Sequence, residues 1–146
     1  MKEVNHMSKV AVVYWSATGN TELMAQSVLN GAAAAGAEAD IFTAGEFSSE
    51  KAKAYDSVAL GCPAMGAEEL EDSEFLPMFE ECAGSLSGKR VALFGSYGWG
   101  DGEWMRSWEE SCAQYGISLT ADSVICCGAP DEAGEAECEA LGRALA

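Results

Sequence analysis

Basic residues are scarce in this sequence. Its 146 residues include eight Lys and Arg against 24 Asp and Glu, which gives a formal net charge of −16. Nucleic acids and anionic membrane surfaces are bound through basic patches, so the charge balance argues against both as partners. It favours docking to proteins with a basic face, although acidity that serves solubility alone is the simpler alternative.

Clusters of metal ligands and long apolar runs are also missing. There is one histidine, His6, and none of the six cysteines is paired at C-x-x-C spacing, which argues against a zinc or iron–sulfur site. No apolar run is long enough for a membrane span or a signal peptide. We therefore expect a cytoplasmic protein with reduced thiols, and we expect the adjacent Cys126 and Cys127 to be buried and inert.

What the sequence does contain is a regular alternation of short apolar runs and helical segments. Strands are predicted at 9–15, 38–43, 57–61, 90–94 and 118–127, and helices at 21–35, 75–83, 103–115 and 131–145. Strands that alternate with helices predict a five-stranded parallel sheet with helices on both faces, an α/β doubly wound three-layer sandwich. We expect one domain over 9–146, preceded by a short N-terminal extension over 1–8. Ligands of such sheets bind outside the carboxyl ends of the strands.

Helical spacing also predicts which side chains are buried. In helix 21–35 it favours a buried face that includes Leu23, Met24 and Val28, and Gly36 is expected to end the helix. In helix 103–115 the buried face is predicted to consist of Trp104, Trp108, Cys112 and Tyr115.

The loop after the first strand, SATGNT over 16–21, is rich in hydrogen-bond donors. Ser16, Thr18 and Thr21 carry hydroxyls, Asn20 carries an amide, and Gly19 lets a ligand approach closely. A helix that begins here offers free N–H groups and the positive end of its dipole to an anion. Without a lysine the loop is not a nucleoside triphosphate site, so a single phosphate is the better interpretation. Simple helix capping needs one such residue rather than four.

The loop after the third strand, GCPAMGAEELEDSEF over 61–75, places Met65 and Gly66 at its bend. A methionine there can cover an aromatic ring, or it can be an ordinary core residue. Most of the acids that follow are expected to be solvated, and Glu68 or Glu69 is a candidate acceptor for a ring N–H.

The loop after the fourth predicted strand, GSYGWGDGEW over 95–104, surrounds Tyr97 and Trp99 with glycines. A tryptophan between glycines has no helix or strand to pack in, so we expect Trp99 to be exposed or stacked on a planar group. Trp104 and Trp108 are expected in the core. Together the three loops point to a planar ring with a phosphate tail.

These segments resemble the flavodoxins. SATGNTE is similar to their phosphate loop, and GCPAMGAEELEDSEF and FGSYGWGDGEW are similar to the two flavin-flanking loops of short-chain flavodoxins from anaerobic bacteria. The resemblance covers 9–146 in order. It implies the strand order 2-1-3-4-5, non-covalently bound FMN, and a monomer that is not an enzyme. The implied role is a low-potential one-electron carrier between redox partner proteins, with basic-faced reductases or oxidoreductases as the partners.

The resemblance also implies a set of FMN-binding residues. In it Met65 and Trp99 cover the two faces of the flavin ring, Glu68 meets the ring N3–H, and Ser96, Tyr97 and Gly98 line the pyrimidine side. Pro63 stands where some relatives have a phosphate-binding serine. The full implied set has three parts: Ser16, Ala17, Thr18, Gly19, Asn20 and Thr21 at the phosphate; Pro63, Ala64, Met65, Gly66, Ala67 and Glu68; and Ser96, Tyr97, Gly98, Trp99 and Gly100.

One backbone motion follows from the same resemblance. The Met65–Gly66 peptide is expected to turn its carbonyl towards the flavin on reduction. The turned peptide needs a positive φ at position 66, which glycine adopts without strain.

Two other functions are open at this point. An FMN-dependent NAD(P)H:quinone or nitro reductase would use the same loops, but such enzymes add segments for a second substrate. A receiver-type domain would need an acidic cluster at the end of the first strand, which is not there. Rapid oxidation of NADPH by the purified protein alone would favour the reductase.

Overall fold

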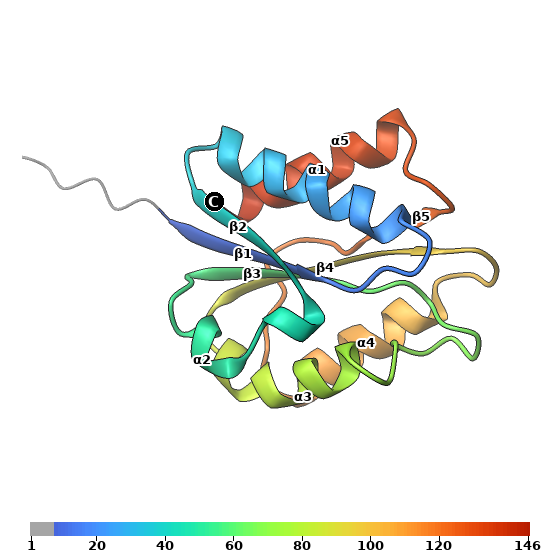
Figure 1. Ribbon diagram of the computed structural model, residues 1–146, viewed down its shortest axis with the longest axis horizontal. Helices are drawn as coiled ribbons and strands as arrows, with labels where there is room; N and C mark the ends of the chain where they lie inside the picture. Colours follow the sequence, from blue (N-terminus) through green and yellow to red (C-terminus); the bar gives the residue numbers. More distant parts are fainter. Residues whose placement is uncertain (1–7) are drawn as a thin grey trace, which may run out of the picture.

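The computed structural model describes residues 8–146 and contains one five-stranded sheet. Its strands are all parallel and lie in the predicted order β2-β1-β3-β4-β5 (Figure 1). The strands are β1 (Lys9–Tyr14), β2 (Glu38–Thr43), β3 (Ser57–Gly61), β4 (Arg90–Tyr97) and β5 (Val124–Cys127). The helices are α1 (Asn20–Ala34), η1 (Ala44–Glu46), α2 (Ser49–Ala52), α3 (Phe75–Leu86), α4 (Glu103–Gln114) and α5 (Glu132–Leu145).

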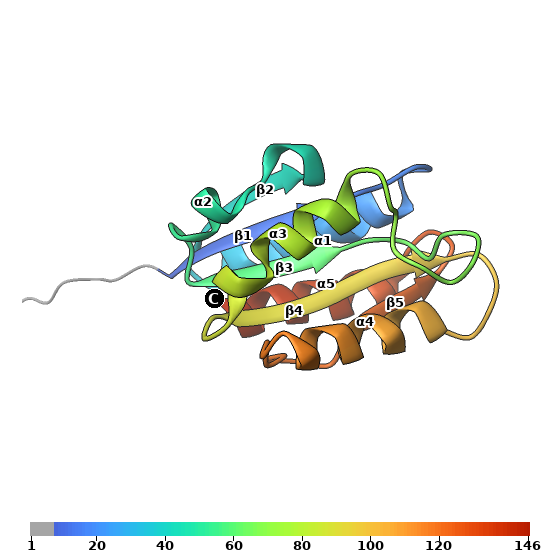
Figure 2. The ribbon, with the colours of Figure 1, turned by 90° about the horizontal axis from the view of Figure 1, so that it is seen from below.

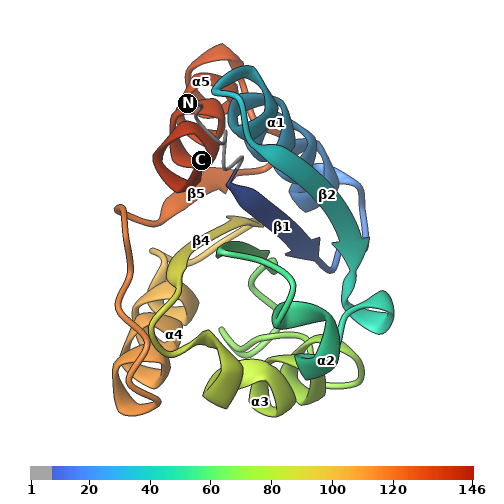
Figure 3. The same ribbon diagram turned by 90° about the vertical axis from the view of Figure 1, so that its left-hand side faces the viewer.

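Helices cover both faces of the sheet, so the predicted three-layer sandwich is confirmed. Helices α1 and α5 lie side by side on one face, and α2, α3 and α4 lie on the other (Figures 2 and 3). Successive strand residues point to opposite faces, so Val10 and Val12 pack under α1 and α5 while Ala11 and Val13 pack towards α3 and α4. Among residues 8–146 no helix is long and apolar enough to cross a membrane.

The face under α1 and α5 is filled mainly by small and branched aliphatic side chains, together with Phe94 and Met24, and the two helices touch through glycines. A Cβ on Gly31 would lie 2.0 Å from the carbonyl oxygen of Glu139, and a Cβ on Gly142 would lie 2.0 Å from that of Val28. Only glycine permits backbones to approach this closely. The opposite face is filled by aromatic rings, with Trp108 edge-on to Phe75 and Phe79 at centroid distances of 5.4 and 6.1 Å.

Strands β4 and β5 differ from the predicted ranges. Strand β4 continues to Tyr97 because Gly95, Ser96 and Tyr97 pair with Ile125, Cys126 and Cys127 of β5. The predicted strand 118–127 is interrupted. Leu119 makes an isolated bridge to Val91, and regular pairing resumes only at Val124. The short polar residues between these two points form a bend, in which Ser123 Oγ donates to Glu109 at 2.6 Å.

The short elements η1 and α2 were not predicted. Residues 44–52 show no apolar periodicity, and both elements are single turns defined by local caps. Thr43 and Glu46 form a reciprocal capping box, and Ser48 Oγ accepts from the amide of Lys51 at 3.2 Å. The predicted helix ends are confirmed at Gly36, which has a φ of 98°, and at Asp131, whose carboxylate caps α5.

Several burial predictions were wrong. Leu23 is 50% exposed and Tyr115 is 44% exposed, because each lies at the margin of its helix's buried stripe. Cys127 is exposed and Cys126 is half-buried, because β5 is an edge strand with one neighbour. Trp104 and Trp108 are buried in the core as predicted.

The predicted extension 1–8 lies outside the described residues except for Ser8. The carbonyl of Ser8 accepts from Glu38 N at 2.8 Å, and its hydroxyl accepts from Arg90 Nη2 at 2.9 Å. Ser8 is therefore held against the sheet.

Candidate functional site

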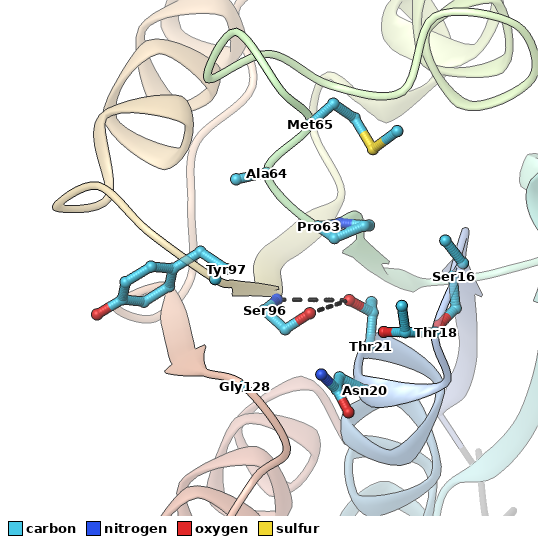
Figure 4. Close-up of a pocket in the computed structure, with 12 residues that line it drawn as sticks. Ser16, Thr18, Asn20, Thr21, Pro63, Ala64, Met65, Ser96, Tyr97 and Gly128 are labelled. Atoms are coloured by element: carbon cyan, nitrogen blue, oxygen red, sulfur yellow. Dashed lines mark hydrogen bonds between the residues drawn. The ribbon is translucent and has the colours of Figure 1, made fainter.

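A cleft of about 260 Å³ lies at the carboxyl ends of β1, β3, β4 and β5 (Figure 4). In the sheet, β2 lies on one side of β1 and β3 lies on the other, so the strand order reverses at β1. Ligands of such sheets bind at this point. None of the residues that line it carries a charge. They are Ser16, Ala17, Thr18, Asn20, Thr21, Pro63, Ala64, Met65, Ser96, Tyr97, Gly98 and Gly128.

Loop 16–21 presents unpaired N–H groups to one end of the cleft. The N-cap of α1 is Gly19, in the left-handed region at a φ of 98°, and no side chain caps the helix from that position. Four backbone N–H groups of this loop donate to no acceptor within residues 8–146: those of Ala17, Thr18, Asn20 and Thr21. Unpaired amides at a helix N-terminus are the donor set that suits an anion.

Ser16 shapes this loop as well as lining it. Its Oγ accepts from the amides of Gly19 at 3.1 Å and Glu22 at 3.3 Å. A hydroxyl that accepts two N–H groups still has its own hydrogen to donate. Ser16 therefore combines the helix-capping role with a free O–H donor.

Thr21 and Ser96 join the two sides of the cleft. Thr21 is 1% exposed, and its Oγ1 lies 2.9 Å from Ser96 Oγ (Figure 4). The amide of Ser96 also points at Thr21 Oγ1, at 3.4 Å. The first turn of α1 is therefore bonded to the end of β4, residues that lie 75 positions apart.

The other end of the cleft is flatter and less polar. Pro63, Ala64 and Met65 form one wall, held to β4 by the hydrogen bond from Ala64 N to Ser96 O at 3.0 Å. Tyr97, at the end of β4, also lines the cleft, and its ring packs on Trp104 at a centroid distance of 5.5 Å. Trp104 is anchored in turn by its indole N–H, which donates to Cys62 O at 3.1 Å. Burial raises the pKa of the Cys62 thiol to about 12, so this thiol stays protonated beneath the wall.

The structure brings most, but not all, of the predicted site residues to the cleft. Gly19 shapes loop 16–21 without lining the cavity. The remaining predicted residues outside the lining are Gly66, Ala67, Glu68, Trp99 and Gly100. They belong to the two loops beyond the flat end, where Trp99 is 64% exposed.

Glu68 has protein contacts of its own. It is the one non-glycine residue of the described part with a positive φ, 57°. Its Oε1 accepts from the amide of Trp104 at 3.3 Å, and its carboxylate lies directly against Gly100. Glu68 therefore connects the loop after β3 to the loop after β4.

Two residues of the site region are absent from the predicted set. Gly128 lines the cleft because its amide donates to Tyr97 O at 2.8 Å, a contact that depends on the β4–β5 pairing. Glu71, expected among the solvated acids, is 5% exposed and accepts from the amides of Ser73, Glu74 and Phe75 at 2.8 Å each. The sequence offered one indication for Glu71, an acid four residues before the apolar start of a helix.

The pKa of Glu71 reflects these bonds. Burial alone raises it, but the Ser73 hydroxyl and the three amides stabilise the charged form and lower the pKa to about 2. Glu71 is therefore ionised, and its carboxylate holds the end of the long loop to the start of α3.

The two ends of the cleft fit a phosphorylated aromatic cofactor. Neutral N–H and O–H donors suit a phosphate, and the less polar lining of Ala64, Met65 and Tyr97 suits a flat ring. The fold and the cleft define a doubly wound α/β protein that holds such a cofactor at its switch point.

Comparison with known proteins gives this class a family. The flavodoxin family model matches residues 12–142. The flavodoxin of Clostridium beijerinckii is 44% identical over 92% of this chain and 97% of its own, and that of Megasphaera elsdenii is 44% identical over 94% and 98%. The solution structure of two-electron reduced M. elsdenii flavodoxin superposes with a TM-score of 0.86 over 93% of this chain and 97% of that one.

The chain belongs to the flavodoxin family. It is an FMN-binding electron carrier that passes electrons to redox partner proteins and turns over no substrate of its own. The predicted family, fold and cofactor are confirmed, and the quinone or nitro reductase and the receiver-type domain are set aside.

Proposed function

We propose that the cleft binds FMN with its phosphate against loop 16–21 and its flavin ring between the loops that follow β3 and β4. The unpaired amides at the start of α1 are the observation that carries this proposal, because N–H groups at a helix N-terminus that bind no protein acceptor are free to donate charge-assisted hydrogen bonds to phosphate oxygens. The hydroxyls of Ser16 and Thr18 add donors. Thr21 has a positioning role: its hydrogen bond to Ser96 holds the end of β4 beside loop 16–21.

The ring-side residues divide into two groups. Ala64, Met65, Tyr97 and Gly98 line the cleft and form the inner walls for the ring, with Pro63 between them and the phosphate. In this proposal Met65 and the exposed Trp99 cover the two faces of the ring, and Glu68 accepts a hydrogen bond from the ring N–H. Gly66, Ala67 and Gly100 set the backbone path of the two covering loops. Bound FMN supplies the redox chemistry, and these residues orient it and exclude water.

A titration with FMN and riboflavin tests the assignment of the phosphate end. Riboflavin lacks only the phosphate, and each charge-assisted bond lost costs about 1.5–3 kcal/mol, so its affinity should be weaker by at least about a hundredfold. The measurement is quenching of flavin fluorescence on binding. Equal affinities would show that loop 16–21 is not the phosphate site.

The distribution of charge supports a basic face on the partner. Lys9 and Arg90 begin β1 and β4, Lys89 precedes Arg90, and Arg143 lies in the last turn of α5, whose Leu145 carbonyl accepts from Arg90 Nη2 at 3.1 Å. These bases therefore lie towards the amino ends of the strands, whereas Lys51 donates to Glu46 O at 2.6 Å, beyond the carboxyl end of β2. At the cleft edge Arg106 pairs with Asp101 at 3.0 Å. The acids in the loops and first helical turns at that edge are Glu22, Glu68, Glu69, Glu71, Asp72, Glu74, Asp101, Glu103, Asp131 and Glu132. The molecule therefore points a negative potential outward from its cofactor edge.

The same acids favour a low reduction potential. Electrons added to a bound group bring negative charge to an edge already surrounded by carboxylates, and Coulomb repulsion disfavours that addition. We further propose a monomer, because a net charge of −16 opposes self-association. A cytoplasmic location is consistent with the exposed Cys127 thiol, which a reducing compartment preserves.

A further inference from the structure

Five aromatic rings form a chain from the cofactor cleft through the core to the far end of α4. The chain begins at Tyr97, which lines the cleft and lies 5.5 Å from Trp104, centroid to centroid. Trp108 follows Trp104 by one helical turn, so the two indoles are neighbours on the buried side of α4. Both indoles also border the same cavity beside α4.

Phe79 extends the chain from Trp108 to the surface. Its ring lies 6.1 Å from that of Trp108 and 5.8 Å from that of Tyr115, edge-on to each at 87°. Tyr115 directly follows α4 and is 44% exposed, whereas none of the three rings before it is more than 2% exposed. The chain therefore starts at the cleft, stays buried through the core and ends at a phenol that solvent reaches.

Four of the five rings can serve as electron donors. Indole and phenol rings lose an electron to a strong oxidant, whereas the ring of phenylalanine is much harder to oxidise. Phe79 therefore couples Trp108 to Tyr115 electronically without being oxidised itself. Trp108 and Tyr115 are seven residues apart, about 10 Å along a helix axis, which a single tunnelling step covers.

The hydrogen bonding of the two indoles keeps an oxidised ring reactive. An indole that loses an electron becomes acidic at Nε1, and it stays a strong oxidant only while it keeps this proton. Trp108 Nε1 is the one buried side-chain nitrogen or oxygen in 8–146 without a hydrogen-bond partner, so no group is in place to take its proton. Trp104 Nε1 donates to Cys62 O at 3.1 Å, and a carbonyl oxygen is too weak a base to remove the proton.

The exposed end of the chain has the opposite property. A phenol that loses an electron releases its proton to water at once, and water reaches Tyr115. Cys112 precedes Tyr115 by one turn and is buried, and burial raises the pKa of its thiol to about 12. Cys112 is therefore not the readily oxidised thiolate, and the missing electron is left at Tyr115.

We propose that these rings form a radical-exit path, which carries oxidising equivalents from the cofactor cleft to Tyr115. When light excites bound oxidised FMN, Trp104 gives up one electron across the Tyr97 ring. Trp108 then returns an electron to Trp104, and Tyr115 returns one to Trp108. In the balance, the flavin gains one electron, Tyr115 loses one electron, and the phenolic proton of Tyr115 passes to water.

The direction of α4 explains what such a path achieves. Helix α4 runs back along the sheet from the loop after β4, so Tyr115 lies at the end of α4 that is remote from the cleft (Figure 2). A radical at Tyr115 is separated from the oxidisable side chains of Met65 and Trp99, and a small thiol in solution can reduce it. This inference rests on the proposed function, which places the flavin ring beside Tyr97.

The test is electron paramagnetic resonance of the FMN-loaded protein, illuminated with blue light and frozen. A cobalt(III) ammine complex is added as the final electron acceptor, because its reduction to cobalt(II) releases the ammonia ligands and is irreversible. We expect a tyrosyl radical whose signal narrows when the protein carries ring-deuterated tyrosine. The signal should be lost in Tyr115→Phe and kept in Tyr55→Phe, which removes a tyrosine outside the chain.

Two core variants form a matched pair. Phe79→Leu and Phe47→Leu each remove one buried ring from the same face of the sheet, but only Phe79 belongs to the chain. Phe79→Leu should therefore lose most of the tyrosyl signal, and Phe47→Leu should keep it. Trp108→Phe should move the radical to an indole, which ring-deuterated tryptophan identifies.

Three results would overturn the proposal. They are a wild-type radical on tryptophan alone, a tyrosyl signal that survives in Tyr115→Phe, and equal losses in Phe79→Leu and Phe47→Leu. FMN binding is measured separately by fluorescence in each sample. A protein that binds FMN normally but forms no radical at Tyr115 lacks the exit path and keeps the proposed function.

Discussion

The two faces of the sheet are packed by opposite means, and each supports one end of the cofactor site. On one face, α1 and α5 meet through Gly31 and Gly142 with their backbones in contact. On the other, α3 and α4 are held apart by the rings of Phe75, Phe79, Trp104 and Trp108. Loop 16–21, the proposed phosphate site, leads into α1, whereas the two loops proposed to hold the ring lead into α3 and α4.

This difference matches what each end of the cofactor requires. A phosphate needs several N–H groups in fixed positions, and α1 is fixed because α5 touches its backbone. A flavin ring needs broad apolar surfaces and room for backbone adjustment. In the proposed binding mode the cleft walls around Ala64, Met65 and Tyr97 supply that surface, and the long loops after β3 and β4 supply the room.

The largest expected effect comes from placing one methyl group on each face. Gly142→Ala puts a Cβ 2.0 Å from Val28 O, which forces the helices apart and should lower the free energy of unfolding by about 3 kcal/mol or more. In Gly84→Ala, on α3, the added Cβ meets nothing within 4 Å, so this variant should raise the free energy of unfolding by roughly 0.5–1 kcal/mol. Urea unfolding at a fixed FMN concentration measures both. Changes of the same sign would contradict the difference between the faces.

The next largest effect concerns Glu71, which ties the long loop to α3. A folded-state pKa of about 2, against an ordinary value of 4.5, means that the carboxylate stabilises the fold above pH 4.5. That contribution, about 3 kcal/mol, should disappear as the pH falls from about 4.5 to about 2. Glu71→Gln should therefore lose roughly 2–3 kcal/mol at pH 7 and show a flatter acid dependence.

The control for Glu71 is Glu80→Gln, an exposed acid on α3. It should change the free energy of unfolding at pH 7 by less than about 0.5 kcal/mol. If the two variants lose stability equally, or if Glu71→Gln keeps the wild-type acid profile, the bonds at the start of α3 do not hold the loop.

A smaller effect is expected for Trp99, at the outer end of the aromatic side. Its ring is 64% exposed, so Trp99→Ala should leave the free energy of unfolding of the FMN-free protein unchanged. Loss of a ring stacked on the flavin should weaken FMN binding about tenfold. Tyr115→Ala, at the far end of α4, should leave FMN affinity as it is. Unchanged affinity in Trp99→Ala, with no quenching of Trp99 fluorescence by FMN, would place this ring away from the flavin.

The smallest effect is expected at Gly66. In this structure its φ is not positive and a Cβ there would meet nothing within 4 Å, so Gly66→Thr should bind FMN almost normally. If the Met65–Gly66 peptide turns on reduction, the side chain should cost roughly 1 kcal/mol in the turned form. A potentiometric titration should then show a smaller separation between the two one-electron potentials. A wild-type separation would rule out the turn, and equal shifts of both potentials would indicate only a disturbed loop.

Local sequence determined the elements and the place of the site. The five strands and four long helices follow from apolar periodicity, and parallel strands bring the loops after β1, β3 and β4 to one edge by geometry alone. Loop 16–21 was identifiable because its donors are contiguous in the chain. Met65 and Tyr97 were identifiable because their loops have unusual compositions.

Tertiary packing decided the features that depend on residues distant in the chain: the ends of two strands, the burial of one acid and several contacts of the site. The true ends of β4 and β5 come from their mutual pairing, which also brings Gly128 to the cleft. The burial of Glu71, the Thr21–Ser96 bond and the contact between Gly142 and Val28 join segments whose separation hides them from any local pattern. Periodicity reports which face of an element is apolar, but the free energy of a hydrogen bond or a close backbone contact depends on where the fold places the second group.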